Sequence, residues 1–335
     1  MPEGFTPILI AVLALAVVFD YINGFHDTAN SIATSVSTRA LKPQWAILMS
    51  AVANFAGALT GTAVAKTVGS GLIESSAEGQ VVVAAALIGA TSWNLITWRF
   101  GIPSSSSHAL IGGLLGASAA GAGFGAWKWD GILNKVLVPL VSSPILGVVI
   151  GLGFMVVLFN VFRRAHPRVL NDRFRRLQVV SASLMAFSHG SNDAQKTMGI
   201  MTLALVTAGV IPEFKIPLWV IILAASAISV GTAAGGWRII KTMGTKVVKL
   251  DPVHGFAAET TAASIILGAS ALGMPVSTTH VISSAIMGAG SADRFGSVRW
   301  ALARNIGVAW VVTLPASGLM AAVAFLVLNP FLGGG

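Results

Sequence analysis

The sequence predicts an all-α polytopic membrane protein built from two inverted-topology repeats of five hydrophobic segments each, with broken helices and paired helical-hairpin turns. Of its 335 residues, 55% are hydrophobic and only 10% are charged. This leaves too little charge for the surface of a soluble protein of this length. Two polar motifs also occur twice each, about half the chain apart. Duplicated polar interruptions of apolar segments indicate a binding site between two repeats.

The apolar segments divide into a first repeat at residues 1–162 and a second at residues 177–335. In chain order they are 5–38, 44–66, 81–102, 108–126 and 136–162, then 177–211, 218–237, 257–273, 280–292 and 305–328. Several are long enough for a bilayer-spanning helix, which needs about 20 residues. The chain has no cysteine, so disulfides and thiolate metal sites are excluded.

The orientation follows from the basic residues, which collect in cytoplasmic loops of membrane proteins. If the arginine-rich linker at residues 163–176 is cytoplasmic, most other basic residues fall on the same side, and the acids fall outside. The basic residues are Arg39, Lys42, Arg238, Lys241, Lys246, Lys249, Arg294, Arg299 and Arg304; the acids are Glu3, Glu74, Glu78, Asp130 and Glu213. We therefore expect a multi-pass protein of the cell inner (plasma) membrane with both termini outside, and the net charge of +9 is not attributed to nucleic acid.

The first duplicated motif, residues 23–31 and 189–197, places Asp27 and Asp193 inside apolar segments. An ionised carboxylate is costly in hydrocarbon, so both must face protein, water or ions. Helix capping or local pairing is the alternative, and the duplication argues against it. The surrounding oxygen-bearing side chains suit a hard cation such as Na⁺. The expected cation-coupling residues are Asp27, Asn30, Asn192, Asp193 and Gln195, with Asp27 and Asp193 as the candidate Na⁺ ligands.

Two further charged residues, Lys196 and Glu259, also lie in apolar segments. Lys196 can contact an anion or neutralise Asp193, and we favour the second. Glu259 lies in the segment before the second serine-rich turn and is a further candidate for a proton or cation. The histidines of both motifs are interpreted as local hydrogen-bonding groups.

The second duplicated motif, residues 103–108 and 275–280, consists of a proline, hydroxyl residues and a histidine. Proline followed by Ser or Thr marks the start of a helix. Free N–H groups and the helix dipole there attract an anion, although such residues also serve as ordinary caps. Because the motif is paired, we expect two helix starts to clamp one tetrahedral oxyanion through Ser105, Ser106, Ser107, Ser277, Thr278 and Thr279. Both a re-entrant tip and a full-span loop are compatible with these turns.

These motifs resemble known signatures. Residues 24–34 and 190–199 resemble the paired signatures of the inorganic phosphate transporter (PiT) family, and residues 103–108 and 275–280 resemble its paired Ser/Thr turns. The resemblance covers essentially the whole chain. It implies a homodimeric secondary symporter of phosphate coupled to Na⁺ or H⁺, without a cofactor, that works by alternating access about a midplane site. The family's motif aspartates map to Asp27 and Asp193. Two departures are His26, where Asn is usual, and a very short central linker.

Two alternatives are weighed against a phosphate symporter. A sulfate permease on the same scaffold is the nearer one, because sulfate differs from phosphate mainly in having no proton to donate. A polytopic membrane enzyme would need a nucleophile paired with a base. The serines here form duplicated clusters and no nucleophile elbow, so we expect a protein that is not an enzyme. The oxygen-rich motifs favour Na⁺ slightly over H⁺ as the coupling ion.

Overall fold

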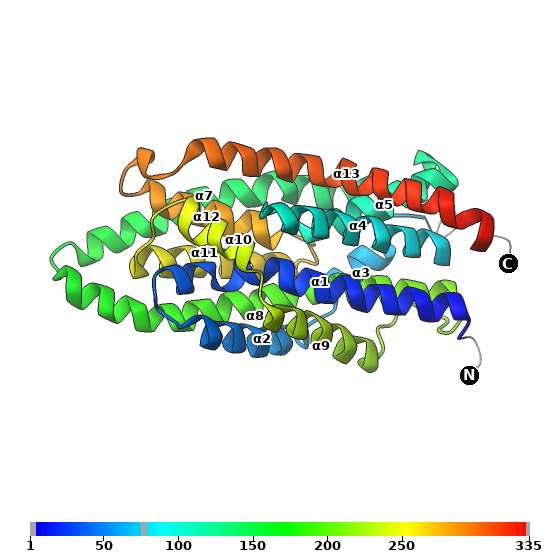
Figure 1. Cartoon of the computed structure of the whole chain (residues 1–335), viewed down its shortest axis with the longest axis horizontal. Helices are drawn as coiled ribbons and strands as arrows, with labels where there is room; N and C mark the ends of the chain where they lie inside the picture. The colour runs from blue at the N-terminus through cyan, green and yellow to red at the C-terminus, as the bar shows by residue number, and fades with distance from the viewer. Residues whose placement is uncertain (1–4, 75–78, 333–335) are drawn as a thin grey trace.

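The computed structural model describes residues 5–74 and 79–332, and every named element of these residues is a helix or helical turn (Figure 1). This confirms the predicted all-α fold. Glu3 and Glu78, used above for the orientation, lie outside the described residues. The main helices of the first half are α1 (Pro7–Ser37), α2 (Pro43–Ala58), α3 (Ala63–Ser70), α4 (Gln80–Phe100), α5 (Ser106–Ala122) and α7 (Val138–Phe162). Those of the second half are α8 (Pro167–Thr207), α9 (Leu218–Ala234), α10 (Trp237–Lys241), α11 (Pro252–Ala271), α12 (Thr278–Ser291) and α13 (Trp300–Leu332).

Short helical pieces complete the connections. They are η2 (Phe124–Ala126), α6 (Trp129–Gly131), η3 (Ile132–Leu137), η4 (Thr242–Lys246) and η5 (Phe295–Ser297). The basic linker is largely helical, because α8 starts inside it with Pro167 in its first turn and a cap from the side chain of His166.

Within residues 5–74 and 79–332, four helices are long and apolar enough to cross a membrane, or six when two bent pairs are each counted as one span. The four are Pro7–Ser37, Gln80–Phe100, Trp129–Phe162 and Trp300–Leu332. The bent pairs are α2 with α3, at 74°, and α9 with α10 and η4, at 61°. The chain is therefore a multi-pass membrane protein with broken helices.

The breaks lie outside the two helices that carry the aspartate motifs. α1 runs without interruption through Asp27, and α8 does so through Asp193. Neither motif contains a proline, and their polar groups are held by side chains of neighbouring helices. The backbone can therefore stay helical at the site.

Both hairpin turns lie inside the protein. α5 and α12 have 17 and 14 residues, or about 26 and 21 Å, which is short of the ~30 Å apolar layer. The residues at their starts, Ser104–Ser107 and Ser277–Thr279, are at most 3% exposed. These lengths and this burial favour re-entrant tips over full-span loops.

The two halves make equivalent contacts. α1 packs on α9 as α8 packs on α2, and α5 packs on α13 as α12 packs on α7. At the first two contacts, glycines sit where a Cβ would overlap a backbone carbonyl of the partner helix; they are Gly24, Gly57, Gly190 and Gly231. Glycine thus lets each motif helix approach its neighbour closely. α1 begins and α13 ends at one end of the bundle, and α7 joins α8 at the other (Figure 1).

Asp251, just before α11, caps the start of this helix. Its carboxylate accepts hydrogen bonds from the backbone N–H groups of Val253 and His254, at 2.9 and 3.0 Å, and lies 2.8 Å from His254 Nδ1. Partial burial opposes ionisation, but the His254 side chain and the two N–H groups outweigh it and lower the pKa of Asp251 below its usual value. The cap therefore stabilises the fold above the unfolded pKa of about 4 and weakens as the pH falls through the lower folded value.

We expect Asp251→Ala to lower the unfolding temperature at neutral pH, since losing such a cap costs about 1 kcal/mol. The difference from the natural protein should shrink in acid below about pH 4. Thermal unfolding in detergent at several pH values measures both effects. Asp172→Ala is the control, because the only ion pair of that exposed acid among the described residues is to exposed Arg175. Equal unfolding temperatures at neutral pH would contradict the cap.

Candidate anion and cation site

The two hairpin tips begin with equivalent helix caps. The Ser105 hydroxyl accepts a hydrogen bond from the His108 backbone N–H at 3.1 Å, and that of Ser277 accepts from the His280 N–H at 3.2 Å. The predicted helix starts are thereby confirmed. The remaining N–H groups of each first turn have no partner within the helix. Each tip can therefore present backbone donors to an anion.

The tips meet each other inside the protein. The Ser107 hydroxyl donates to the Val276 carbonyl at 3.3 Å, and the rings of His108 and His280 lie 4.8 Å apart between centroids. Lys196 Nζ donates to both tips, to the Ser107 hydroxyl and, at 2.9 Å, to the Val276 carbonyl. Turns that are more than 160 residues apart in the chain thus form one structure.

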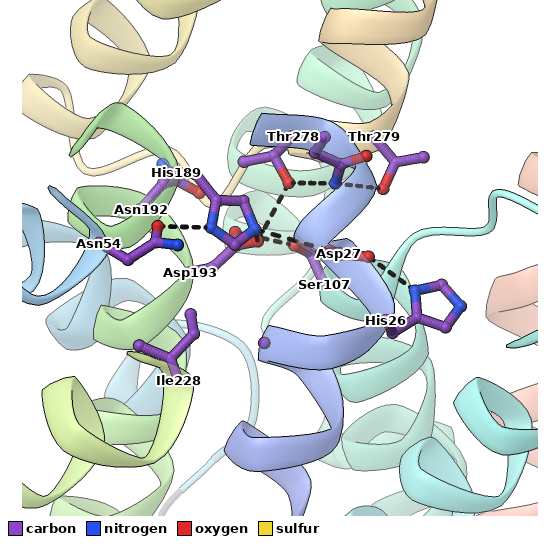
Figure 2. Close-up of polar contacts among 12 residues, drawn as sticks. His26, Asp27, Asn54, Ser107, His189, Asn192, Asp193, Ile228, Thr278 and Thr279 are labelled. Atoms are coloured by element: carbon purple, nitrogen blue, oxygen red, sulfur yellow. Dashed lines mark hydrogen bonds and ion pairs between the residues drawn. The ribbon is translucent and has the colours of Figure 1, made fainter. Parts of the chain in front are cut away.

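Asp193 is the centre of this structure (Figure 2). One carboxylate oxygen pairs with Lys196 Nζ, which confirms the expected pairing of that lysine. The other accepts from the Thr278 hydroxyl at 3.0 Å and lies 3.0 Å from His189 Nε2. Asp193 and Lys196 are 0% and 2% exposed. A buried carboxylate with this many donors is held ionised and fixed in position.

His189 connects the two motif acids (Figure 2). Its Nε2 lies 3.0 Å from Asp193 Oδ2 and 3.9 Å from Asp27 Oδ2, while its Nδ1 lies 2.9 Å from Asn54 Oδ1. Both ring nitrogens face oxygen atoms, so the imidazolium form satisfies them best. Asp27, His189 and Asp193 could also hold a metal ion, because one ligand atom from each lies within 4.8 Å of the others.

Asp27 and Asn30 of α1 belong to the same cluster as Asp193 and His189. Asp27 Oδ1 is 2.6 Å from His26 Nδ1. The Asn30 amide donates to the Thr279 hydroxyl at 2.9 Å and to that of Thr278 at 3.3 Å. Asn30 of the first half thus holds the tip of the second half, and Lys196, its motif equivalent, holds the tip of the first. Each motif helix therefore contacts the hairpin of the other half.

Three predicted cation residues lie outside this cluster. Asn192 donates to Ser270 at 2.8 Å, and Gln195 accepts from the Val64 backbone N–H at 2.9 Å. Glu259 accepts from the hydroxyls of Thr34 and Ser181, each at 2.5 Å. None of the three has a polar contact with Asp27 or Asp193 among residues 5–74 and 79–332. Their coupling role stays a prediction.

The sequence interpretation gave too little weight to two residues. His189 was treated as a local hydrogen-bonding group, although its place one helical turn before Asp193 could have indicated the contact. Asp20 was not considered. It is fully buried, and seven residues, or two turns of α1, separate it from Asp27.

Paired hairpins whose helix starts meet beside buried acids are typical of membrane transporters. The chain belongs to the phosphate transporter family, whose model matches residues 23–321. This confirms the resemblance and places the protein among transporters and not enzymes.

Similar proteins support this assignment. The chain is 49% identical over 325 residues to a "probable low-affinity inorganic phosphate transporter" of Bacillus subtilis, covering 96% of this chain and 97% of that one. It is 50% identical over 321 residues to a protein of the same description from Rhizobium meliloti, covering 95% and 96%. A solved structure described as "the sodium-dependent phosphate transporter" is similar with a TM-score of 0.88 and 25% identity, covering 98% of this chain and 100% of that one.

Proposed function

We propose that this protein is a symporter that carries inorganic phosphate across the inner membrane together with Na⁺ or H⁺. The observation that carries the proposal is the meeting of two capped helix starts, one from each half, beside Asp193 and Lys196. Backbone donors and a lysine supply positive potential for an anion. The substrate is inferred from the relatives, since both of those described above are named as probable low-affinity inorganic phosphate transporters.

The anion would lie between the tips, bound by Ser105, Ser106, Ser107, Ser277, Thr278 and Thr279. Of these, Ser106 has a buried hydroxyl with no hydrogen-bond partner among the described residues, so it is free to bind a ligand. The nearby carboxylate of Asp193 favours phosphate over sulfate. It can accept a hydrogen bond from protonated phosphate, whereas sulfate has no proton to give.

The coupling cation would bind near Asp27 and Asp193. Phosphate would bring negative charge into a site where the Lys196 ammonium and the His189 imidazolium only balance the carboxylates of Asp27 and Asp193, so its binding would be opposed by electrostatic repulsion. A further Na⁺ or H⁺ would remove the repulsion and let phosphate bind, and phosphate would in turn strengthen cation binding, because such coupling is reciprocal. The similarity to a sodium-dependent transporter supports a cation of this kind.

The transport cycle would depend on the two similar halves of the chain. Residues 1–162 and 177–335 would be inverted repeats, as their equivalent helix contacts suggest. Rocking of the hairpins and motif helices about the shared site would expose it to each side in turn. α7 and α13 carry exposed apolar side chains such as Val141, Val149, Val311 and Leu319. We assign these faces to lipid and to a homodimer contact.

The proposed function is tested by uptake of radiolabelled phosphate into proteoliposomes with Na⁺ and pH gradients imposed separately. Accumulation above the external concentration under one gradient, with weak competition by sulfate, is the expected result. Liposomes without protein are the control. Accumulation of sulfate in preference to phosphate would favour the permease, and conversion of the label into an organic ester would indicate an enzyme.

Ser106→Ala gives a sharp test of the anion site. Because the Ser106 hydroxyl has no partner among the described residues, removing it should leave the unfolding temperature unchanged without phosphate. Phosphate affinity should fall about 10-fold or more, since a hydrogen bond to a charged group is worth about 1.5–3 kcal/mol. Titration calorimetry measures the affinity. Ser118→Ala, also buried in α5 but bonded to the Leu115 carbonyl at 2.9 Å, is the matched control and should bind normally. Equal affinities for the two variants would refute the assignment of Ser106.

A further inference from the structure

Asp20 is a buried acid that the proposed site does not use. It is 0% exposed, and its Oδ1 accepts from the Thr197 hydroxyl at 2.8 Å. Its Oδ2 has no hydrogen-bond partner, and no ion pair to Asp20 exists among the described residues. A buried, unpaired carboxylate is costly. An acid in such a position is therefore expected to have a function or to carry a proton.

Asn23, one turn further along α1, has the same deficiency. It is 2% exposed, and its Oδ1 has no hydrogen-bond partner in the described part of the chain. Two buried acceptor oxygens on adjacent turns of one helix both lack a donor. A proton on Asp20 would turn its Oδ2 from an acceptor into a donor and remove the cost of the unpaired charge. Glu259 differs, because its two oxygens already receive three hydrogen bonds.

Asp20 also stands in line with the other acids. Asp20, Asp27 and Thr34 follow one another at seven-residue intervals on α1, about 10 Å apart and on one face. Each contacts a different level of the interior: Thr197 for Asp20, His189 for Asp27 and Glu259 for Thr34. Carboxyl groups are therefore present at three depths along α1, and Asp20 is at the level nearest the N-terminal end of the helix.

The charged surroundings of Asp20 come from α8. α2 and α9, which also pack against α1, carry no titratable residue, and α4 carries only Arg99 at its far end. The charged groups that act on Asp20 are His189, Asp193 and Lys196, all on α8. All of these pair within the site already described.

We propose that Asp20 is a proton-binding residue of the transport path and takes up the coupling proton on the side of the chain termini. This rests on the proposed symport. The proton comes from water on that side, binds the free Oδ2 as the carboxylate becomes a carboxylic acid, and is released to water on the opposite side with the phosphate. Asp20 would thus be a proton-binding residue that does not itself contact phosphate.

Asp20→Asn tests the proposal, because the amide keeps the shape and can still accept from Thr197 but cannot take up a proton. In proteoliposomes, phosphate/phosphate exchange at equal pH on both sides should stay within about 3-fold of the natural protein. Accumulation driven by a pH gradient should fall at least 10-fold, and the apparent affinity should lose its dependence on pH after correction for phosphate speciation. Asp20→Glu should restore part of the accumulation, and Asp130→Asn, at an exposed acid, should change nothing.

Each other result overturns the proposal in a distinct way. Normal pH-driven accumulation by Asp20→Asn would show that this residue carries no coupling proton. Loss of exchange together with accumulation would assign it a structural role. Accumulation by the natural protein under a Na⁺ gradient alone would leave phosphate symport standing and remove the proton from it. Failure of the natural protein to move phosphate under either gradient would overturn the proposed function itself, and the role of Asp20 with it.

Discussion

Asp193→Asn is expected to abolish concentrative phosphate uptake. The carboxylate pairs with Lys196 and also contacts Thr278 and His189, so it connects α8 with the second hairpin and balances a buried ammonium. Removing one partner of a buried ion pair costs about 3–5 kcal/mol, because the other charge is left uncompensated. We expect both a lower unfolding temperature and uptake at the level of empty liposomes.

A second substitution separates these two effects. Asp193→Asn combined with Lys196→Met removes both charges and should recover most of the unfolding temperature, since replacing both partners of a buried pair is often nearly neutral. Uptake should stay at background, because the carboxylate and the ammonium are both missing from the site. Concentrative uptake with normal gradient dependence in either variant would contradict the role assigned to Asp193.

Gly190→Leu is expected to have the second largest effect, on folding. A Cβ at Gly190 would overlap the Asn54 backbone carbonyl of α2, so α8 and α2 would have to separate beside His189. Overpacking of this kind costs about 1–3 kcal/mol or more. The variant should give little monodisperse protein in detergent and a clearly lower unfolding temperature.

Gly153→Leu is the matched control for this variant. It makes the same substitution inside a helix, but a Cβ at Gly153 of α7 has no atom of the described residues within 4 Å. It should express and unfold like the natural protein. Equal behaviour of the two leucine variants would show that the close approach of α8 and α2 is not needed.

The sequence was sufficient for features set by local chemistry. Apolar length gave the membrane helices, and proline with hydroxyl residues gave the helix starts at Ser106 and Thr278, because caps depend on neighbours in the chain. The motif residues also gave the family. The pairing of Lys196 with Asp193 follows from their i,i+3 spacing on one helix face.

Features that depend on contacts between residues far apart in the chain could not be predicted from the sequence. The hold of Asn30 on the tip of the other half joins residues nearly 250 positions apart, and no local pattern encodes such a contact. Broken helices were predicted without the positions of the breaks, which come after Ala58 and after Ala234. Asp20 could have been recognised from its seven-residue spacing to Asp27. Its missing partners became visible only in the folded chain.

A structure determined with phosphate bound tests the central claim most directly. Arsenate, which has the same shape and scatters anomalously, can identify the anion. We predict density for one tetrahedral anion in contact with both tips, within hydrogen-bonding distance of Ser106 and of a hydroxyl among residues 277–279. Density that contacts only one tip, or that lies on the basic surface away from both, would contradict the account.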